Sequence, residues 1–370
     1  MTKPPTPTPT RSAPTMNDVA RATNVSKMTV SRALRGDRIA PETKARILAE
    51  IDRLHYVPHA AAGALASRRS GFVAVIVPSI DNANFAETVR GLEAELRAAG
   101  LDLLLGTTEY RIGREDELLQ TMMRHRPEGI VLTGGVHTSR VADRLARSGI
   151  PVVETWDLPA TPIGHVVGFS NRAAGAMMTE HLAAIGRRRI AFLGGASPRD
   201  PRGEARKHGY LEALVRLGLG PPRTLRYGLP PLSMHHGAAG LARTIARWPD
   251  IDGLVCASDP IAFGAISECQ RRGIAVPQTI AIGGFGDFEI ARCSHPAITT
   301  IAVEAAQIGQ RAGAILRTAI EALRRGEACP AAIDETSMSL EVRGSTVGER
   351  EGKDFFFGKK NTAVRLSRDC

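Results

Sequence analysis

The chain has few aromatic residues and few cysteines, which several common kinds of binding site require. Aromatic residues make up 4% of its 370 positions, so a nucleobase held between stacked rings is not the ligand we expect. Its five cysteines are scattered, odd in number, and form neither a C-x-x-C pair nor a Cys/His metal spacing. Such cysteines are typical of reduced thiols in a cytoplasmic protein, and they predict neither a metal site nor a disulfide framework.

Long apolar runs and enzyme motifs are also missing. No apolar run approaches the ~20 residues that a membrane helix needs, and the Pro- and Thr-rich start lacks the apolar core of a signal peptide. The sequence has no G-x-x-x-x-G-K-[ST], no H-E-x-x-H and no G-x-S-x-G, and Gly284-x-Gly286 lacks the third glycine of a dinucleotide fingerprint. We therefore expect no membrane partner, no cofactor and no catalytic residues, hence a protein that is not an enzyme.

The positive charge is concentrated near the start of the chain. The formal net charge is +10. Residues 1–70 hold 12 Lys/Arg and 5 Asp/Glu, whereas the other 300 residues hold 36 and 33. Because Lys and Arg displace condensed counterions from phosphates, a basic segment followed by a nearly neutral body is typical of a DNA-binding headpiece.

Residues 16–35 read M-N-D-V-A-R-A-T-N-V-S-K-M-T-V-S-R-A-L-R. Two short helical patterns flank a polar turn, and the hydroxyl of Ser26 is placed to cap the second helix. That helix carries Val30, Ala33 and Leu34 on one face, which leaves its polar residues pointing outward. The pattern predicts a helix-turn-helix, whose second helix enters the DNA major groove. The alternative is a helical hairpin inside another kind of domain.

Composition divides the rest of the N-terminal region. Residues 1–14 are rich in Pro and Thr and are expected to form a disordered tail. A third helix from about Pro41 to Leu54 would cover the first two and complete a headpiece over residues 15–58. Residues 59–70 are Ala-rich but too short for a stable isolated helix, which predicts either a hinge helix that orders when something holds it or a flexible linker.

From Phe72 onward, short apolar runs alternate with amphipathic helices. This alternation predicts an α/β fold with parallel sheets, and about 275 residues of it exceed one compact sheet, so we expect two lobes. Ligands of such folds bind at the carboxyl ends of the strands, here in the cleft between the lobes. The body spans residues 71–345, and residues 346–370 form a charged tail without an assigned role. The buried strands expected are residues 73–77, 101–105, 130–132, 152–153, 190–193, 254–257 and 280–282.

Several motifs together resemble one family. The N-D-V-A and S-K-M-T-V-S-R-A-L-R runs, the H-Y-V-P-H that ends the headpiece and the A-G-A-L-A-S linker resemble the LacI/GalR family of transcriptional repressors. The resemblance covers roughly residues 16–345. Other runs are similar to the gluconate-repressor branch of this family, and they lie at residues 26–32, 78–87, 132–138, 149–154, 167–171 and 268–277.

The resemblance implies a small all-α helix-turn-helix headpiece and a two-lobed α/β body similar to periplasmic binding proteins. It implies a regulator, in this branch a repressor, that binds double-stranded operator DNA as a homodimer and controls a carbohydrate or sugar-acid catabolic operon. A small effector between the lobes would then weaken DNA binding, although the sequence itself does not give that sign. The lobe boundaries expected from the family are residues 71–168 with 299–328 for lobe 1, and residues 169–298 with 329–345 for lobe 2.

The family pattern also implies roles in DNA binding. Lys27, Met28 and Arg32 would face base edges, because arginine can bind guanine through two hydrogen bonds and methionine can contact a thymine methyl. Hydroxyl side chains near the helix starts would bond phosphates and fix the register. Leu65 matches the leucine that the family wedges into the minor groove, the alternative being a packing residue of the linker. The expected DNA-contacting residues are Thr15, Ser26, Lys27, Met28, Thr29, Ser31, Arg32, Thr43, Tyr56, His59 and Leu65.

The expected effector site follows the ends of the body strands. Arg206 matches the arginine with which family members grip effectors and would pair with a carboxylate, unless it is one more solvated arginine. Gly286 departs from the acidic residue that binds neutral sugars in many relatives, which favours an anionic ligand such as gluconate. Phe85 and Trp156 would stack on a ligand or simply belong to the core. The expected effector-binding residues are Ser79, Asn84, Phe85, Thr133, Trp156, Asp157, Arg206, Ser258, Asp259 and Asp287.

Two other classes of protein remain open on the sequence. One is a transport-type sugar-binding protein without a DNA function, against which the basic headpiece argues. The other is a sugar-acid dehydrogenase or kinase with a helical cap, against which the missing phosphate-binding loop argues. A tetramer is not expected, because the C-terminal tail has no leucine heptad.

Overall fold

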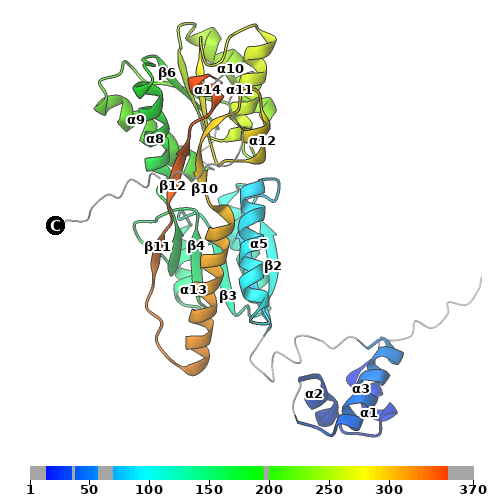
Figure 1. The fold of residues 1–370 in the computed structure, drawn as a ribbon. Coiled ribbons are helices and arrows are strands. Elements are labelled where there is room, and N and C mark those ends of the chain that lie inside the picture. The colour runs from blue at the N-terminus through cyan, green and yellow to red at the C-terminus, as the bar shows by residue number, and fades with distance from the viewer. Residues whose placement is uncertain (1–13, 36–37, 57–69, 196–199, 349–370) are drawn as a thin grey trace, which may run out of the picture.

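The computed structural model describes residues 14–35, 38–56, 70–195 and 200–348 (Figure 1). Almost all of the predicted N-terminal tail, most of the predicted linker and the chain after residue 348 lie outside these ranges. Within the described ranges, no helix combines the length and apolar character needed to cross a membrane.

The headpiece consists of three helices, as the sequence predicts. They are α1 (Met16–Ala22), α2 (Lys27–Arg35) and α3 (Pro41–Leu54). Ser26 caps α2, since its Oγ accepts a hydrogen bond of 3.1 Å from the Thr29 amide. The fully buried side chains of Val19, Val30 and Ile47, one from each helix, form the centre of a small apolar core.

The body contains two six-stranded sheets, and parallel pairing dominates both. The first sheet has the order β11-β5-β4-β3-β1-β2 and the second β12-β10-β9-β8-β6-β7, with β10 and β12 the antiparallel pair. Strands covered by helices on both faces read as continuous apolar runs, as F-V-A-V-I-V does at β1. The strands are β1 (Phe72–Val77), β2 (Asp102–Thr107), β3 (Gly129–Thr133), β4 (Val152–Thr155), β5 (His165–Gly168), β6 (Ile190–Gly194), β7 (Arg223–Arg226), β8 (Gly253–Cys256), β9 (Ala281–Phe285), β10 (Thr299–Val303), β11 (Ile333–Glu335) and β12 (Met338–Glu341).

Helices flank each sheet and alternate with its strands. Several begin where the sequence places a cap: Asn82, Thr138 and Ser170 each accept a hydrogen bond from a backbone amide of the first turn. The body helices are α5 (Ala83–Arg97), α6 (Ile112–Met123), α7 (Ser139–Ala146), α8 (Asn171–Ala184), α9 (Pro201–Arg216), α10 (Met234–Arg247), α11 (Asp259–Arg271), α12 (Glu289–Cys293), α13 (Ala305–Arg325) and α14 (Gly344–Val347).

The chain passes between the two lobes three times. It crosses after β5, after β10 and between β11 and β12, and Figure 1 shows β10 and β12 leading to the junction. This corrects two lobe boundaries predicted from the family pattern. Residues 299–303 belong to lobe 2, because β10 pairs with β9. Residues 333–335 belong to lobe 1, because β11 pairs with β5.

Glycines allow the closest helix contacts of the body. At the α5–α13 contact of lobe 1, a Cβ on Gly91 would collide with the Ala306 carbonyl group, and one on Gly309 would collide with the Thr88 carbonyl oxygen. Neither atom could move without shifting a helix backbone, so these two helices can approach this closely only where a side chain is absent. Since Thr88 lies in α5 beside the cleft, this contact also fixes one wall of the site.

We expect Gly309→Ala to lower the free energy of unfolding by about 1–3 kcal/mol, because the added methyl group overpacks the α5–α13 contact. Urea unfolding of the variant checks this. Gly113→Ala is the matched control, since nothing lies within 4 Å of the Cβ it would add in α6. The control should be neutral or slightly more stable, and equal destabilisation of both variants would contradict the explanation.

Candidate functional site

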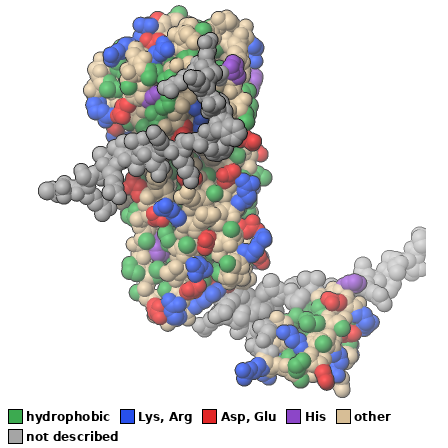
Figure 2. Space-filling view, in the orientation of Figure 1, with side chains coloured by type: hydrophobic (Ala, Val, Ile, Leu, Met, Phe, Trp, Pro, Cys, Tyr) green, Lys and Arg blue, Asp and Glu red, His purple; other side chains and the backbone are tan. Residues whose placement is uncertain are grey.

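The second headpiece helix presents an outward face of the kind a DNA groove accepts. Lys27, Met28 and Arg32 are exposed, whereas Val30 and Ala33 of the same helix are buried. Met28 is 66% exposed, so it offers an apolar contact surface on the outward side of this helix. Figure 2 shows Lys and Arg side chains on the headpiece surface.

The other predicted DNA-contacting residues are distributed unevenly. Thr29, Ser31 and Thr43 are half-buried, and Ser26 and Thr15 are exposed. The Thr15 hydroxyl donates to Asp18 at 2.7 Å, and hydrogen bonds from Thr15 lower the pKa of that carboxyl. Tyr56 is 7% exposed and packs in the headpiece core, which leaves little of it for a DNA contact. His59 and Leu65 lie outside the described residues.

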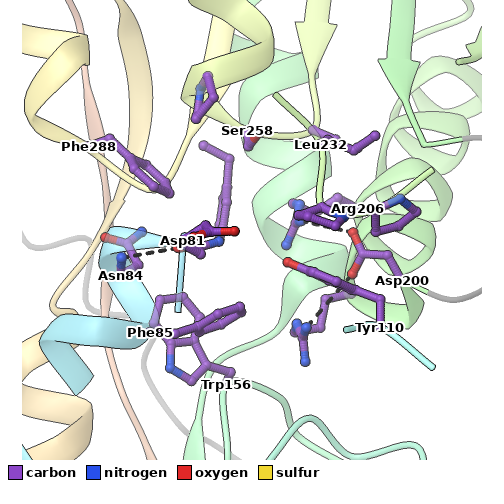
Figure 3. Close-up of a pocket in the computed structure, with 17 residues that line it drawn as sticks. Asp81, Asn84, Phe85, Tyr110, Trp156, Asp200, Arg206, Leu232, Ser258 and Phe288 are labelled. Carbon is purple, nitrogen blue, oxygen red and sulfur yellow. Dashed lines mark hydrogen bonds and ion pairs between the residues drawn. The ribbon is translucent and has the colours of Figure 1, made fainter. Parts of the chain in front are cut away.

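A cavity lies between the two lobes at the carboxyl ends of their strands. In Figure 3, Asp81, Asn84, Phe85, Tyr110 and Trp156 face it from lobe 1, and Asp200, Arg206, Leu232, Ser258 and Phe288 face it from lobe 2. The remaining lining residues are Asn82, Arg202, Pro230, Pro231, Ala257, Pro260 and Phe285.

Aromatic side chains form the inner wall of the cavity. Trp156 packs edge-on against Phe85 with ring centroids 5.2 Å apart, and Phe169 continues the row toward Phe285. The Trp156 indole donates a hydrogen bond of 3.0 Å to the Thr88 hydroxyl, which fixes the ring plane. These rings offer flat apolar surfaces that suit the C–H faces of a small polar molecule.

Two arginines of α9 supply positive charge to the cavity. Arg202 lies over the Phe85 ring, with its guanidinium carbon 5.3 Å from the centroid, and Arg206 lies over Phe285 at 4.2 Å. Both residues are buried, and each has a guanidinium nitrogen 4.0 Å from an Asp200 carboxylate oxygen, which is too long for a hydrogen bond. Burial lowers the pKa of Arg206.

Arg206 has more donors than the protein satisfies. One terminal nitrogen donates to the Asn171 side chain, but its buried Nε has no hydrogen-bond partner. A buried donor without an acceptor is costly, particularly on a charged group. The neighbouring Tyr110 hydroxyl lies in the same environment, where burial and the charge of Asp200 raise its pKa. The site can therefore accept a ligand that brings acceptor oxygens.

Hydrogen bonds link the lobes beside the cavity, and one of them lies at Gly286. Asn84 of α5 donates through Nδ2 to the carbonyl oxygen of Gly286, which follows β9, at 2.9 Å. Gly286 has φ +118, and a Cβ there would lie 2.5 Å from the Phe288 ring and 2.7 Å from Asn84 Nδ2. A side chain at this position would strain the backbone and would require Phe288 and Asn84 to shift.

Half of the predicted effector residues line this cavity. They are Asn84, Phe85, Trp156, Arg206 and Ser258. Thr133 and Asp157 instead line an adjoining smaller cavity, which shares Tyr110 and Arg202 with the first.

Three predicted effector residues line neither cavity, and each has another partner. Ser79 is 1% exposed, and its Oγ accepts a hydrogen bond from the Asp81 amide. Asp259 is fully buried and accepts from the Thr300 hydroxyl at 2.7 Å and the Phe288 amide at 2.9 Å. Burial raises the pKa of Asp259 to about 7. Asp287 pairs with Arg343 and Arg292.

Sequence reasoning missed Arg202, Tyr110 and Asp200. For Arg202 a signal existed, because residues four apart in a helix share a face and Arg202 precedes Arg206 by four. Tyr110 follows β2 and Asp200 precedes α9, and no periodic pattern marks either position.

A buried ionic group adjoins the smaller cavity. His137 Nδ1 lies 2.9 Å from a Glu115 oxygen, and its Nε2 lies 3.3 Å from a Glu154 oxygen. Glu115 also lines the smaller cavity. Burial lowers the pKa of the histidine, but the two carboxylates outweigh it and raise that pKa to about 9.

Both the headpiece and the body match known protein families. Residues 15–59 match the bacterial regulatory proteins of the lacI family, and residues 179–346 match a periplasmic binding protein-like domain. The HTH-type transcriptional regulator GntR of Pseudomonas aeruginosa is 38% identical over 82% of this chain and 89% of its own length. GntR of Escherichia coli K12 is 33% identical over 90% of this chain and 98% of its own length.

A solved structure agrees with this placement over most of the chain. A LacI-family transcriptional regulator from Silicibacter pomeroyi superposes with a TM-score of 0.83 at 32% identity, and the match covers 90% of this chain and 99% of that one. These relatives are transcriptional regulators rather than enzymes. The three-helix headpiece, the two-lobed parallel α/β body and these matches lead to one conclusion: the chain belongs to the LacI family of DNA-binding transcriptional regulators.

Proposed function

We propose that this regulator represses a sugar-acid catabolic operon, and that a small sugar acid such as gluconate, bound between the lobes, weakens its hold on operator DNA. The observation that carries the proposal is the pair of buried arginines, Arg202 and Arg206, that line the cavity and make no hydrogen bond to the nearby Asp200. The similarity to regulators named GntR supports a regulatory role, and the polar side chains that line the cleft support a small polar ligand.

The charge of the cavity favours a carboxylate ligand. Arg202 and Arg206 are buried and carry two positive charges, while Asp200 stands 4.0 Å from each and makes no hydrogen bond to either. A ligand carboxylate would satisfy the free N–H groups with charge-assisted hydrogen bonds, which are about twice as strong as neutral ones. A neutral sugar would leave this positive charge less well compensated.

The remaining lining groups suit a polyhydroxylated chain. Asn82, Asn84 and Ser258 offer donors and acceptors, and the exposed Asp81 at the rim offers acceptors only. Gly286 supplies no carboxylate at the position where an acidic residue would favour a neutral sugar. This absence supports an anionic ligand, whereas the amide and hydroxyl groups suit the hydroxyls of either kind of ligand.

Binding in this cleft can reach the DNA through the lobe angle. Ligand contacts from both lobes favour one relative arrangement, and three chain crossings join the lobes. A coupling of about 1–3 kcal/mol between effector and operator would change operator affinity about 5- to 150-fold.

The free edge of the first sheet supports a homodimer. Strand β2 lies at that edge, where Leu104 is 40% and Leu105 is 41% exposed. An edge strand with exposed leucines is a surface that proteins usually cover. A two-fold dimer would also bring two recognition helices to successive major grooves of a pseudo-palindromic operator.

We expect Arg206→Ala to weaken gluconate binding about 100-fold, because it removes charge-assisted hydrogen bonds worth about 1.5–3 kcal/mol each. Calorimetry with gluconate and glucose measures this. Arg216→Ala, on the exposed part of the same helix, is the control and should bind like the wild type. If the wild type prefers glucose, or if Arg206→Ala binds gluconate normally, the effector assignment is wrong.

Operator binding should depend on the outward face of α2. Arg32→Ala is expected to cost about 1–3 kcal/mol of specific affinity, because a bidentate base contact is lost. Footprinting on the DNA beside the protein's own gene first locates the operator, and fluorescence anisotropy on that segment then measures the affinity at two salt concentrations. Arg53→Ala is the control, since that arginine already pairs with Glu50 at the end of α3. Equal losses in both variants would show that base readout does not pass through Arg32.

Leu104→Asp should yield a monomer, because a charge on the β2 edge opposes burial of that surface. Light scattering after gel filtration reports the mass. Leu323→Asp is the control, because Leu323 is 53% exposed on α13 and away from the β2 edge. A dimer that persists in Leu104→Asp would place the interface elsewhere.

A further inference from the structure

His137 is a buried, charged side chain that belongs neither to the apolar core nor to the lining of the effector cavity. Its side chain is 5% exposed, and those of Glu115 and Glu154 are 9% and 1% exposed. The three residues come from separate elements, namely the turn before α7, the first turn of α6, and β4. Burying three ionisable groups is expensive unless their geometry is well defined, so the arrangement is specific.

The surroundings identify the imidazolium as the positive member of the group. Glu115 accepts from Nδ1 through both oxygens, at 2.9 and 3.0 Å, whereas a Glu154 oxygen lies 3.3 Å from Nε2 as an ion-pair partner without hydrogen-bond geometry. The second Glu154 oxygen accepts from the Ile163 amide, which anchors this carboxylate to lobe 1. On the same two helices, Asp116 of α6 pairs with Arg140 and Arg144 of α7.

The turn that carries His137 reaches the cleft. Residues 134–136 line the smaller cavity, and the Thr133 carbonyl oxygen just before them accepts a 3.1 Å hydrogen bond from Arg202 of lobe 2. Gly134 has φ +108, and a Cβ there would lie 2.9 Å from the Arg202 guanidinium. The turn is therefore pressed against an arginine that also lines the effector cavity.

We propose that His137 is a positioning residue: its protonated ring, held between Glu115 and Glu154, locks the turn at residues 133–137 so that this turn holds Arg202 in place for the effector. The expected effect of His137 on ligand affinity rests on the proposed sugar-acid function. The expected effect of His137 on the turn does not. His137 does not touch the ligand; it acts through the Thr133 carbonyl and Arg202.

The pH dependence follows from the sign of the shift. The pKa of His137 is raised from the ordinary 6.5 to about 9, so the protonated ring stabilises the fold fully below the unfolded value. That contribution is lost as pH rises from 6.5 through about 9. His165 and His181 shift the other way, because burial lowers their pKa values, so their effects lie below this window. Asp259 is half-ionised at its pKa of about 7, so its titration overlaps the lower part of this window, and only a step that disappears in the His137 variant belongs to His137.

The test uses the full chain and the variants His137→Gln and His165→Gln. His165 is the matched control, because it is a buried histidine of lobe 1 whose Nδ1 accepts from the Ala332 amide, away from the turn. Hydrogen exchange measures protection of residues 133–137, and calorimetry measures gluconate affinity from about pH 7 to about pH 9.5.

In His137→Gln we expect exchange in the turn to rise about tenfold or more while β6 stays protected, and gluconate affinity to fall about tenfold. The wild type should lose affinity as pH approaches 9.5, and the variant should show no such step. Glu115→Gln should fold and shift the wild-type step to lower pH, which keeps the idea testable if His137→Gln does not fold.

If hydrogen exchange of residues 133–137 is unchanged in His137→Gln, the proposal is overturned. It is also overturned if exchange rises in that variant while gluconate affinity and its pH dependence stay as in the wild type. The His165→Gln control should leave the turn and the affinity as in the wild type. If the wild type binds no gluconate at any pH, the proposed effector is wrong, and the exchange measurement alone then decides whether His137 holds the turn and Arg202.

Discussion

The cleft depends on burying two guanidinium groups where the protein supplies too few acceptors. Arg202 and Arg206 are both less than one tenth exposed, and they stack on phenylalanines from opposite lobes. Positive charge in such a place is tolerated only because Asp200 stands near, Asn171 accepts one hydrogen bond, and the Thr133 carbonyl accepts another. The unmet demand of Arg206 makes this interface between the lobes responsive to an anion.

The lobe junction follows from the same requirement. Helix α9 must bring Arg202 from lobe 2 to the Phe85 ring of lobe 1, while Asn84 reaches back from lobe 1 to the Gly286 carbonyl. Contacts thus run in both directions across the gap. A change in what fills the gap therefore changes the relative energies of lobe arrangements, which is how a small molecule can act on a distant headpiece.

Much of the fold could be predicted from sequence because its signals are local. Ser26 caps α2 as expected, and strands such as β1 and β8 are continuous apolar runs. Strand β11 was missed since it is short and largely exposed, and the crossings after β10 and β11 depend on long-range pairing that no local pattern encodes. For the site, residue types at strand ends were predicted better than side-chain directions: Asp259 and Asp287 turn to Thr300 and Arg343 instead of the cavity.

The three crossings also bear on how the polypeptide is made. Lobe 1 is built from β1 to β5 near the start of the body and from α13 and β11 near its end. Lobe 2 is built from the segment between them, and β12, which follows β11, completes it. During synthesis neither lobe is complete until the ribosome has passed β11, and only the contiguous headpiece can assemble early. The nascent body therefore contains apolar strands whose sheet neighbours have not yet been made, until β11 and then β12 leave the ribosome.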